Sequence, residues 1–399
     1  MMIPERPTLE RRVLAALDGS AGGGPRIAVL LGGCGSGRTS LLLRLRDLIG
    51  RTQAQYVDVE RIATTPERFL HTLRDASPFP GLPYGQTPPP DGGARDAFDA
   101  ALAFLDTARA PSTSPATFLL DEFLELRTFE SFPGLRSVLR DLIAALASSG
   151  NRFVLTSRYS ARALRLLRDA PAQFEIIHVS PLSAAEVRAT LPGAHHDDHV
   201  RGAGHSAAEE EVERRRDELA RMVQALSDGR PLYARAIAET ATMMGTRGAA
   251  DPLGALASLL APGGQLAQTC RFCYELRLHR ARGYGALKAI LDVLAQEEPL
   301  TLTEIALRLR RTPGSTKDYL SWLEDVDLIV SRNKRYSFAD PMLRLWVRLH
   351  CRPVPPGDDE VGRELHAYAQ ARLPHAEPAL ALAAAETERE KNWGIIEID

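Results

Sequence analysis

A glycine-rich segment that joins a strand pattern to a helix pattern is the feature that most constrains the fold of this chain. Residues 26–33 form a continuous apolar run ending in glycines, which is typical of a strand buried on both faces of a sheet. Residues 39–50 follow with helical spacing and a terminal glycine. This order places the glycines at the start of a helix, where backbone N–H groups form a site for phosphate oxygens. We therefore predict a phosphate-binding loop here, the alternative being a turn made for packing alone.

The loop sequence GGCGSGRTS departs at one position from the pattern G-x-x-x-x-G-K-[ST]. Its glycines let the backbone close around a ligand, and Thr39 offers a hydroxyl to Mg²⁺. Arg38 stands where the pattern has lysine; it keeps the positive charge, but its guanidinium is longer, planar and forked. We therefore predict that nucleotide binding is retained and that rapid hydrolysis is lost. The nucleotide-binding residues predicted in the loop are Gly32, Gly33, Cys34, Gly35, Ser36, Gly37, Arg38, Thr39 and Ser40.

Two carboxylates follow the next strongly apolar strand pattern, in residues 117–126. In P-loop enzymes an aspartate at such a strand end holds the metal, and an adjacent glutamate orients and deprotonates the attacking water. We predict that Asp121 binds Mg²⁺ together with Thr39 and that Glu122 is catalytic. The alternative is an ordinary solvated strand end.

Hydroxyl and guanidinium groups end a third apolar strand pattern, in residues 152–158. Thr156, Ser157 and Arg158 should emerge at the same sheet edge as the phosphate loop, because ligands bind at the carboxyl ends of parallel strands. A hydroxyl there can orient the attacking water, and Arg158 can reach the γ-phosphate. We predict Ser157 as a nucleotide contact and Arg158 as catalytic.

The pattern along the chain predicts four regions. Strands alternate with helices up to residue 190, which indicates a parallel sheet with helices on both faces. After this, residues 191–282 are predicted to be a helical lid domain that begins with an irregular insertion at 191–208. Residues 283–351 are predicted to be a winged helix, with three helices at 284–296, 301–311 and 315–327 and a hairpin at 328–338. Residues 352–399 are predicted to be a linker and an acidic tail.

Composition excludes several classes of protein. The 399 residues are 44% hydrophobic and 25% charged with a net charge of −2, as in ordinary soluble proteins. Four cysteines are too few for a disulfide framework, which fits a reducing compartment. The N-terminus lacks the apolar run of a signal peptide, and no stretch reaches the roughly 18 apolar residues of a membrane helix. We predict a cytoplasmic protein with no membrane partner.

The predicted winged helix carries a modest local excess of positive charge. Residues 308–335 hold seven basic residues and four acidic ones, a balance of +3. Ser315, Thr316, Lys317 and Tyr319 would then lie on a recognition helix near a DNA groove. DNA contact and an intramolecular clamp on the nucleotide domain are equally compatible with this pattern.

Three weaker signals concern histidine and cysteine. His195, His196, His199 and His205, with Asp197 and Asp198, follow no known metal-binding spacing, so we interpret them as a solvated loop. Cys270 and Cys273 form a single C-x-x-C in a helical stretch, and a tetrahedral zinc site needs four ligands, so we interpret them as structural thiols. Cys34, inside the phosphate loop, is a candidate oxidation-sensitive residue.

The segments GGCGSGRTS, FLLDEF, VLTSR, VSPLSAAEV and DGRPLYARAIAE occur in an order that resembles the STAND-type, AAA+-related P-loop ATPases. The resemblance covers residues 8–350 and is greatest to short bacterial and archaeal members with a C-terminal winged helix, whose closing segment is similar to residues 336–350. It implies that ATP or ADP binds with Mg²⁺ between the P-loop domain and a helical lid, with Pro231 near the adenine. It also implies that Arg158 senses the γ-phosphate.

Three functions follow as hypotheses. The first is an ATP-binding switch, a slow ATPase that couples nucleotide state to winged-helix position, homo-oligomerisation or a protein partner. The second is a DNA-binding transcriptional regulator that does not hydrolyse ATP and uses the P-loop domain as a scaffold. The third is a protein–protein adaptor that binds neither ligand.

Overall fold

A five-stranded parallel sheet forms the core of the N-terminal half. The computed structural model describes residues 6–19, 26–80, 92–171, 173–191, 207–245, 250–279, 283–352, 354 and 356–373. The strands lie in the order β2-β3-β4-β1-β5. Their bounds are β1 Ile27–Leu31, β2 Ala54–Asp58, β3 Thr117–Asp121, β4 Arg152–Ser157 and β5 Phe174–His178. All neighbouring pairs are parallel, so the five carboxyl ends meet at one edge of the sheet.

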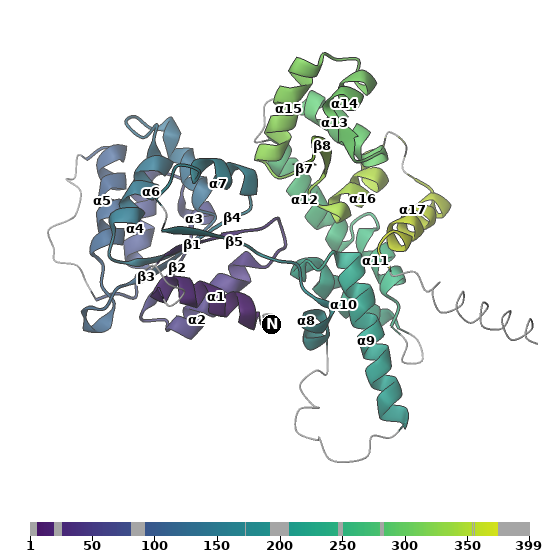
Figure 1. Cartoon of the computed structure of the whole chain (residues 1–399), viewed down its shortest axis with the longest axis horizontal. Coiled ribbons are helices and arrows are strands. Elements are labelled where there is room, and N and C mark those ends of the chain that lie inside the picture. Colours follow the sequence, from purple (N-terminus) through teal and green to yellow (C-terminus); the bar gives the residue numbers. More distant parts are fainter. Residues whose placement is uncertain are drawn as a thin grey trace, which may run out of the picture.

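Helices cover both faces of this sheet, as the alternation of strand and helix patterns predicted (Figure 1). Helices α1 Pro7–Asp18 and α2 Arg38–Ile49 pack on one face, against alternate strand residues such as Leu30 and Val154. The opposite face is covered by α3 Val59–Ile62, α4 Pro66–Asp75, α5 Ala94–Thr107, α6 Val138–Ser148 and α7 Ser160–Leu166. Burial on both faces explains why the strands are apolar throughout.

The second half of the chain is mainly helical. Helices α8 Ala184–Thr190, α9 Ala207–Ser227, α10 Pro231–Met244, α11 Pro252–Leu260 and α12 Gln265–His279 are followed by α13 Tyr284–Gln296, α14 Leu302–Arg308, α15 Pro313–Asp325, α16 Pro341–His350 and α17 Asp358–Gln370. Strands β6 Leu300–Thr301, β7 Ile329–Arg332 and β8 Arg335–Phe338 form an antiparallel sheet of order β6-β8-β7. No helix within the described ranges is long and apolar enough to cross a bilayer.

The structure adds elements that the sequence patterns did not predict. Helices α1, α3 and α7 are new, and the 3₁₀ segment η2 Phe123–Ser131 follows β3 where a longer strand was predicted. Helix α17 lies within residues 352–399, which were predicted to be only linker and tail. It is a helix because one face of it packs, with Leu365 and Tyr368 buried in the main core. Residues 374–399 and the histidine-rich insertion lie outside the described residues.

The two halves meet where the end of α15 touches the start of α7. Asp327 accepts a hydrogen bond of 2.7 Å from the backbone N–H of Ser160 and so caps α7. Arg165 of α7 pairs with Asp325. Arg277 of α12 donates to the Asp327 carbonyl at 2.8 Å. The C-terminal region is therefore docked two residues beyond Arg158, a predicted site residue.

We expect this junction to tighten below neutral pH. Burial raises the pKa of Asp327 to about 6, despite the Ser160 N–H and the Arg277 charge, which lower it. A carboxyl whose pKa is higher in the docked state stabilises docking most when protonated, so the gain is lost as pH rises through about 6. The gain in docking free energy is at most about 3 kcal/mol, since a shift of one pKa unit corresponds to about 1.4 kcal/mol. Protection factors of the α7 amides, which correct hydrogen exchange for its intrinsic pH dependence, measure this gain at pH 5 and 7.5. In Asp327→Asn the difference between the two should vanish, and an unchanged difference contradicts the assignment.

Candidate nucleotide-binding site

The phosphate loop connects β1 to α2 with two glycines in a left-handed backbone conformation. Gly35 has φ of 75° and Gly37 has φ of 86°, values that L side chains rarely adopt. Gly37 is the N-cap of α2, and no side chain caps this helix. The first N–H groups of α2 are therefore not capped by a side chain and can bind an anion.

Arg38 folds back over the loop. Its Nη1 donates to the Gly33 carbonyl at 2.7 Å and to the Ser36 hydroxyl at 3.1 Å. Its Nη2 reaches Glu122 at 2.5 Å, and both side chains are less than 10% exposed. Its Nε is buried without a hydrogen-bond partner. The residue that replaces the lysine therefore spans the space between the phosphate loop and the predicted general base.

Asp121, at the carboxyl end of β3, accepts hydrogen bonds from three hydroxyl groups. Its Oδ2 accepts from Thr39 at 2.7 Å and from Tyr56 at 2.9 Å. Its Oδ1 accepts from Thr156, which in turn accepts the Glu122 N–H at 3.0 Å. Burial first, and then the Asp121 charge, raise the pKa of Tyr56, so its phenol stays a neutral donor. The carboxylate and the Thr39 hydroxyl, two hard oxygen ligands, thus lie together as a Mg²⁺ site requires.

Glu122 lies between two arginines. Its backbone is left-handed, with φ of 57°, a strained conformation for a residue with a side chain. Its carboxylate accepts the Arg158 N–H at 3.0 Å and pairs with the Arg158 Nε at 3.2 Å. Burial alone would raise the pKa of Glu122, but Arg38 and Arg158 outweigh burial and hold it below its usual range. Arg158 also pairs with Glu60, so its charge is shared by two carboxylates.

The start of α10 lies directly on the phosphate loop. A Cβ at Gly37 would lie 3.3 Å from Pro231, and a Cβ at Gly35 would lie 3.0 Å from Leu232. The Leu232 N–H also donates to the Gly35 carbonyl at 3.3 Å. Pro231 therefore contacts the phosphate loop itself in this structure. The start of α10 therefore lies over the loop that a nucleotide would enter.

Arg230 joins this loop to the C-terminal region. Its Nη1 donates to the Cys34 carbonyl at 3.0 Å, and its Nη2 donates to the Ala339 carbonyl at 2.8 Å. Asp340 pairs with Arg230 at 3.2 Å and accepts the Tyr233 hydroxyl at 2.7 Å. The Asp340 side chain is only 6% exposed, so these charges are largely removed from water.

The residues present fit a magnesium-bound nucleoside triphosphate. The glycine cradle, the uncapped start of α2 and the unpartnered Nε of Arg38 all offer donors to phosphate.

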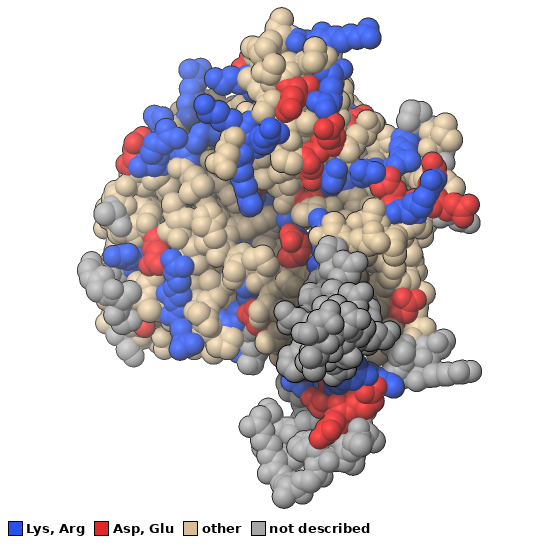
Figure 2. Space-filling view, turned by 45° about the vertical axis from the view of Figure 1, so that its right-hand side comes forward, with Lys and Arg blue, Asp and Glu red and all other residues tan. Residues whose placement is uncertain are grey.

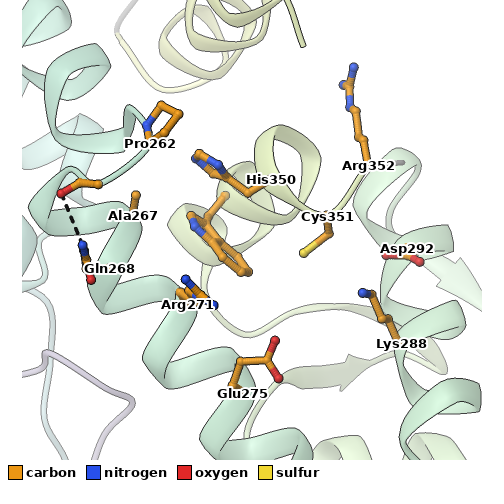
Figure 3. A pocket seen from close by; sticks show the side chains of 12 residues that line it. Pro262, Ala267, Gln268, Arg271, Glu275, Lys288, Asp292, His350, Cys351 and Arg352 are labelled. Atoms are coloured by element: carbon orange, nitrogen blue, oxygen red, sulfur yellow. Dashed lines mark hydrogen bonds between the residues drawn. The ribbon is translucent and has the colours of Figure 1, made fainter. Parts of the chain in front are cut away.

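A pocket of about 670 Å³ lies elsewhere, between α12, α13 and α16, with none of its lining from the sheet domain (Figure 3). Trp346 and His350 line it together with Arg271, Glu275, Lys288 and Asp292. It is separate from the phosphate loop and is not the nucleotide site.

The structure brings most of the predicted site residues together at one sheet edge. The β1–β4 register pairs Leu31 with Ser157, which places Arg158 beside the loop. Ser157, predicted as a nucleotide contact, is fully buried, and its hydroxyl accepts the Tyr159 N–H at 3.0 Å in the turn after β4. Thr156 is the hydroxyl that faces the carboxylates.

Several site residues were missed by sequence reasoning. No motif predicts Tyr56 or Glu60. The β2–β3 register nevertheless pairs Asp58 with Asp121, which places the end of β2 beside the Asp121 carboxylate. Arg230 could have been predicted from the sequence, since it belongs to the same GRP turn as Pro231. Asp340 and Cys273 carried no signal of their role, because both act through contacts more than one hundred residues away along the chain.

Comparison with known proteins identifies the fold. A Walker-type ATPase of Pyrococcus abyssi, PABY2304, is similar with a TM-score of 0.60 and 17% identity, over 87% of this chain and 96% of that chain. The fold is that of a P-loop ATPase. The Aeropyrum pernix ORC1 protein, solved in complex with DNA, has a TM-score of 0.40 at 16% identity, over 92% of this chain and 93% of that one. Caenorhabditis elegans PCH-2 has 0.32 at 12%, over 62% and 63%. These two scores are too low to support an argument. No family model and no curated protein matches the chain.

Among the described residues, no three His, Cys, Asp or Glu side chains gather as metal ligands. Cys270 and Cys273 are both buried and free. The histidines at 195, 196, 199 and 205 lie outside the described residues.

Proposed function

We propose that the chain is an ATP-binding molecular switch of the STAND/AAA+-like type, which hydrolyses ATP slowly. The observation that supports this most is the Arg230 guanidinium, which binds the Cys34 carbonyl of the phosphate loop and the Ala339 carbonyl of the C-terminal region. A nucleotide in the loop displaces one end of this bridge and weakens the other. Loop occupancy and the position of the C-terminal region are therefore coupled.

The roles of the site residues follow from their contacts. Mg²⁺ would be held by Thr39 and Asp121, and when bound with ATP it neutralises charge on the phosphates. Glu122 orients the attacking water and accepts its proton, and Arg158 stabilises the negative charge of the γ-phosphate. Because Arg38 and Arg158 lower the pKa of Glu122, the carboxylate is a weak base while both arginines hold it. This pairing is the physical reason to expect slow turnover.

We extend the proposal to the domain arrangement. Residues 1–190 are the P-loop domain, 191–282 the helical lid and 283–351 a winged helix, in a cytoplasmic protein that acts through a protein partner or a second copy of itself. The winged-helix assignment is supported by three helices, α13, α14 and α15, followed by an antiparallel hairpin.

Nucleotide binding is tested with a substitution in the loop and a matched one outside it. Gly37→Ala should abolish ATP binding, because it forces a side chain into φ of 86° and against Pro231. Gly50→Ala imposes similar strain at φ of 111° at the far end of α2, where no atom lies within 4 Å of the new Cβ. We expect wild type and Gly50→Ala to release heat on titration with ATP and Mg²⁺, and Gly37→Ala to release none. A wild type that shows neither heat nor a thermal shift at millimolar nucleotide refutes the proposal.

A second function, a non-hydrolysing DNA-binding regulator, is favoured by the charge of α14, α15 and the β7–β8 hairpin. All seven basic residues of 308–335 are exposed, whereas Asp325 and Asp327 are engaged with α7. Figure 2 shows Lys and Arg side chains over the top of the molecule, at the height of these elements in Figure 1. Thr316, predicted to lie near a DNA groove, is instead fully buried, and its hydroxyl donates to the Thr312 carbonyl.

The two functions separate on duplex DNA binding measured at several salt concentrations. The regulator predicts binding that weakens steeply with salt and is lost when Arg332, Lys334 and Arg335 are replaced by alanine, but not when Arg214 and Arg215 of α9 are. It also predicts that Gly37→Ala with Thr39→Ala leaves DNA binding unchanged. Binding of neither DNA nor nucleotide would favour an adaptor.

A further inference from the structure

Two thiols from distant parts of the chain touch at the phosphate loop. The Sγ atoms of Cys34 and Cys273 lie 2.9 Å apart, although 239 residues separate them. Cys34 stands in the middle of the glycine cradle, and Cys273 lies on α12. A disulfide bond is about 2.05 Å long, so the two sulfurs need to approach by less than about 1 Å.

The surroundings divide the chemistry between the two sulfurs. Cys34 is partly exposed, whereas Cys273 is 7% exposed. The hydrogen bond from Cys273 and the charges of Arg277, Arg158 and Arg38 lower the pKa of Cys34 to about 6, although burial opposes them. The hydrogen bond to Cys34 and then burial raise the pKa of Cys273. Cys34 is therefore the thiolate that attacks an oxidant, and Cys273 is the resolving thiol that then attacks the oxidised Cys34.

We propose that Cys34 and Cys273 form an oxidation site, a dithiol that a hydroperoxide converts to a disulfide between the phosphate loop and α12.

The reaction balances with the hydroperoxide as oxidant. The Cys34 thiolate attacks one peroxide oxygen, the O–O bond breaks, and with one proton the products are a Cys34 sulfenic acid and water. The Cys273 sulfur then attacks the Cys34 sulfur, an S–S bond forms, and the S–O bond breaks. The departing hydroxide takes the Cys273 proton and leaves as a second water. Two thiols have lost two electrons and two protons, and hydrogen peroxide has been reduced to two waters.

The disulfide would hold the loop in its covered state. Cys34 is already held by Arg230 through its carbonyl, and Leu232 lies against Gly35 in the same loop. A nucleotide can enter only if the lid withdraws, and a covalent bond from Cys34 to α12 prevents withdrawal. This consequence rests on the proposed nucleotide-binding function, whereas formation of the disulfide does not. By linkage, bound nucleotide should disfavour the disulfide, relative to the dithiol at equilibrium, by the same factor.

The oxidation site is tested by peptide mapping of the full chain. Protein treated with an equimolar amount of hydrogen peroxide is blocked with N-ethylmaleimide, digested without reductant and analysed by mass spectrometry. We expect one linked peptide pair, Cys34 with Cys273, which disappears with dithiothreitol and is absent in Cys273→Ser. Cys270→Ser is the matched control, because Cys270 lies one turn away on α12, is fully buried and has a pKa raised by that burial. It should leave the linked pair unchanged.

Affinity for a fluorescent ATP analogue gives the second readout. Oxidised wild type should bind at least about tenfold more weakly than reduced wild type, and oxidised Cys273→Ser should match its reduced form. A map without the Cys34–Cys273 pair, or with other pairs at equal yield, overturns the oxidation site. Oxidised protein that carries the pair and binds as tightly as reduced protein overturns the locking role. Reduced protein that binds no nucleotide refutes the proposed function instead, and the map alone then decides the oxidation site.

Discussion

Replacing Glu122 by glutamine should lower phosphate release by about a hundredfold or more, the usual contribution of a positioned general base. It should also destabilise the fold, because the two arginines that Glu122 holds are then buried without their shared carboxylate. Breaking such a buried pair costs about 3–5 kcal/mol. Phosphate release and urea denaturation, measured on the same preparations, separate the two effects.

Glu60→Gln is the matched control for this prediction. Glu60 pairs with the same Arg158, but its side chain is 35% exposed, against 7% for Glu122. We expect near wild-type turnover and a loss of less than about 1 kcal/mol. Arg38→Lys should act in the opposite sense to Glu122→Gln: a lysine lacks the forked guanidinium, releases Glu122 and raises turnover by about tenfold. Wild-type release at background that neither change alters would mean a switch without hydrolysis.

Replacing Asp340 by alanine should be among the most destabilising single changes in the C-terminal region. The change leaves Arg230 and the Tyr233 hydroxyl buried without their shared partner. It also removes the cap of α16, because Asp340 accepts the N–H groups of Met342 and Leu343. We expect a loss of about 3–5 kcal/mol in unfolding free energy, measured by urea denaturation.

Asp251→Ala supplies the control for the cap alone. Asp251 caps α11 through the Gly254 N–H at 2.8 Å, in an exposed position. It should cost about 1 kcal/mol, the usual value of an N-cap. Equal losses in the two variants would show that the ion pair with Arg230 contributes nothing.

The sequence was sufficient for the parts of the site that lie on local patterns. The apolar run of β1, the glycines and the helical spacing of α2 predict the loop, and parallel strands bring Asp121 and Arg158 to the same edge. These inferences need only the period of each element and the direction of the strands.

The contacts that define the state of the site had no local signal. The motif leaves open whether Arg38 points toward solvent or back to Glu122, because that choice depends on a carboxylate 84 residues away along the chain. Cys273 was interpreted as a structural thiol, and no local pattern indicates its contact with Cys34, which is 239 residues away. Ser157 is buried and its hydroxyl accepts the Tyr159 N–H, whereas Thr156 faces Asp121, because alternate residues of a strand face opposite sides.

In the proposed switch, the start of α10, which lies against Gly35 and Gly37, competes with ATP for the phosphate loop. An ATP molecule binds only the fraction of chains whose loop is open, so the measured dissociation constant equals the intrinsic one divided by that fraction. Each 1.4 kcal/mol gained or lost in lid docking therefore changes the apparent affinity about tenfold, with no change in any atom that touches the nucleotide. In the proposed switch, a partner that bound the C-terminal region would set the ATP concentration at which the protein responds without approaching the site.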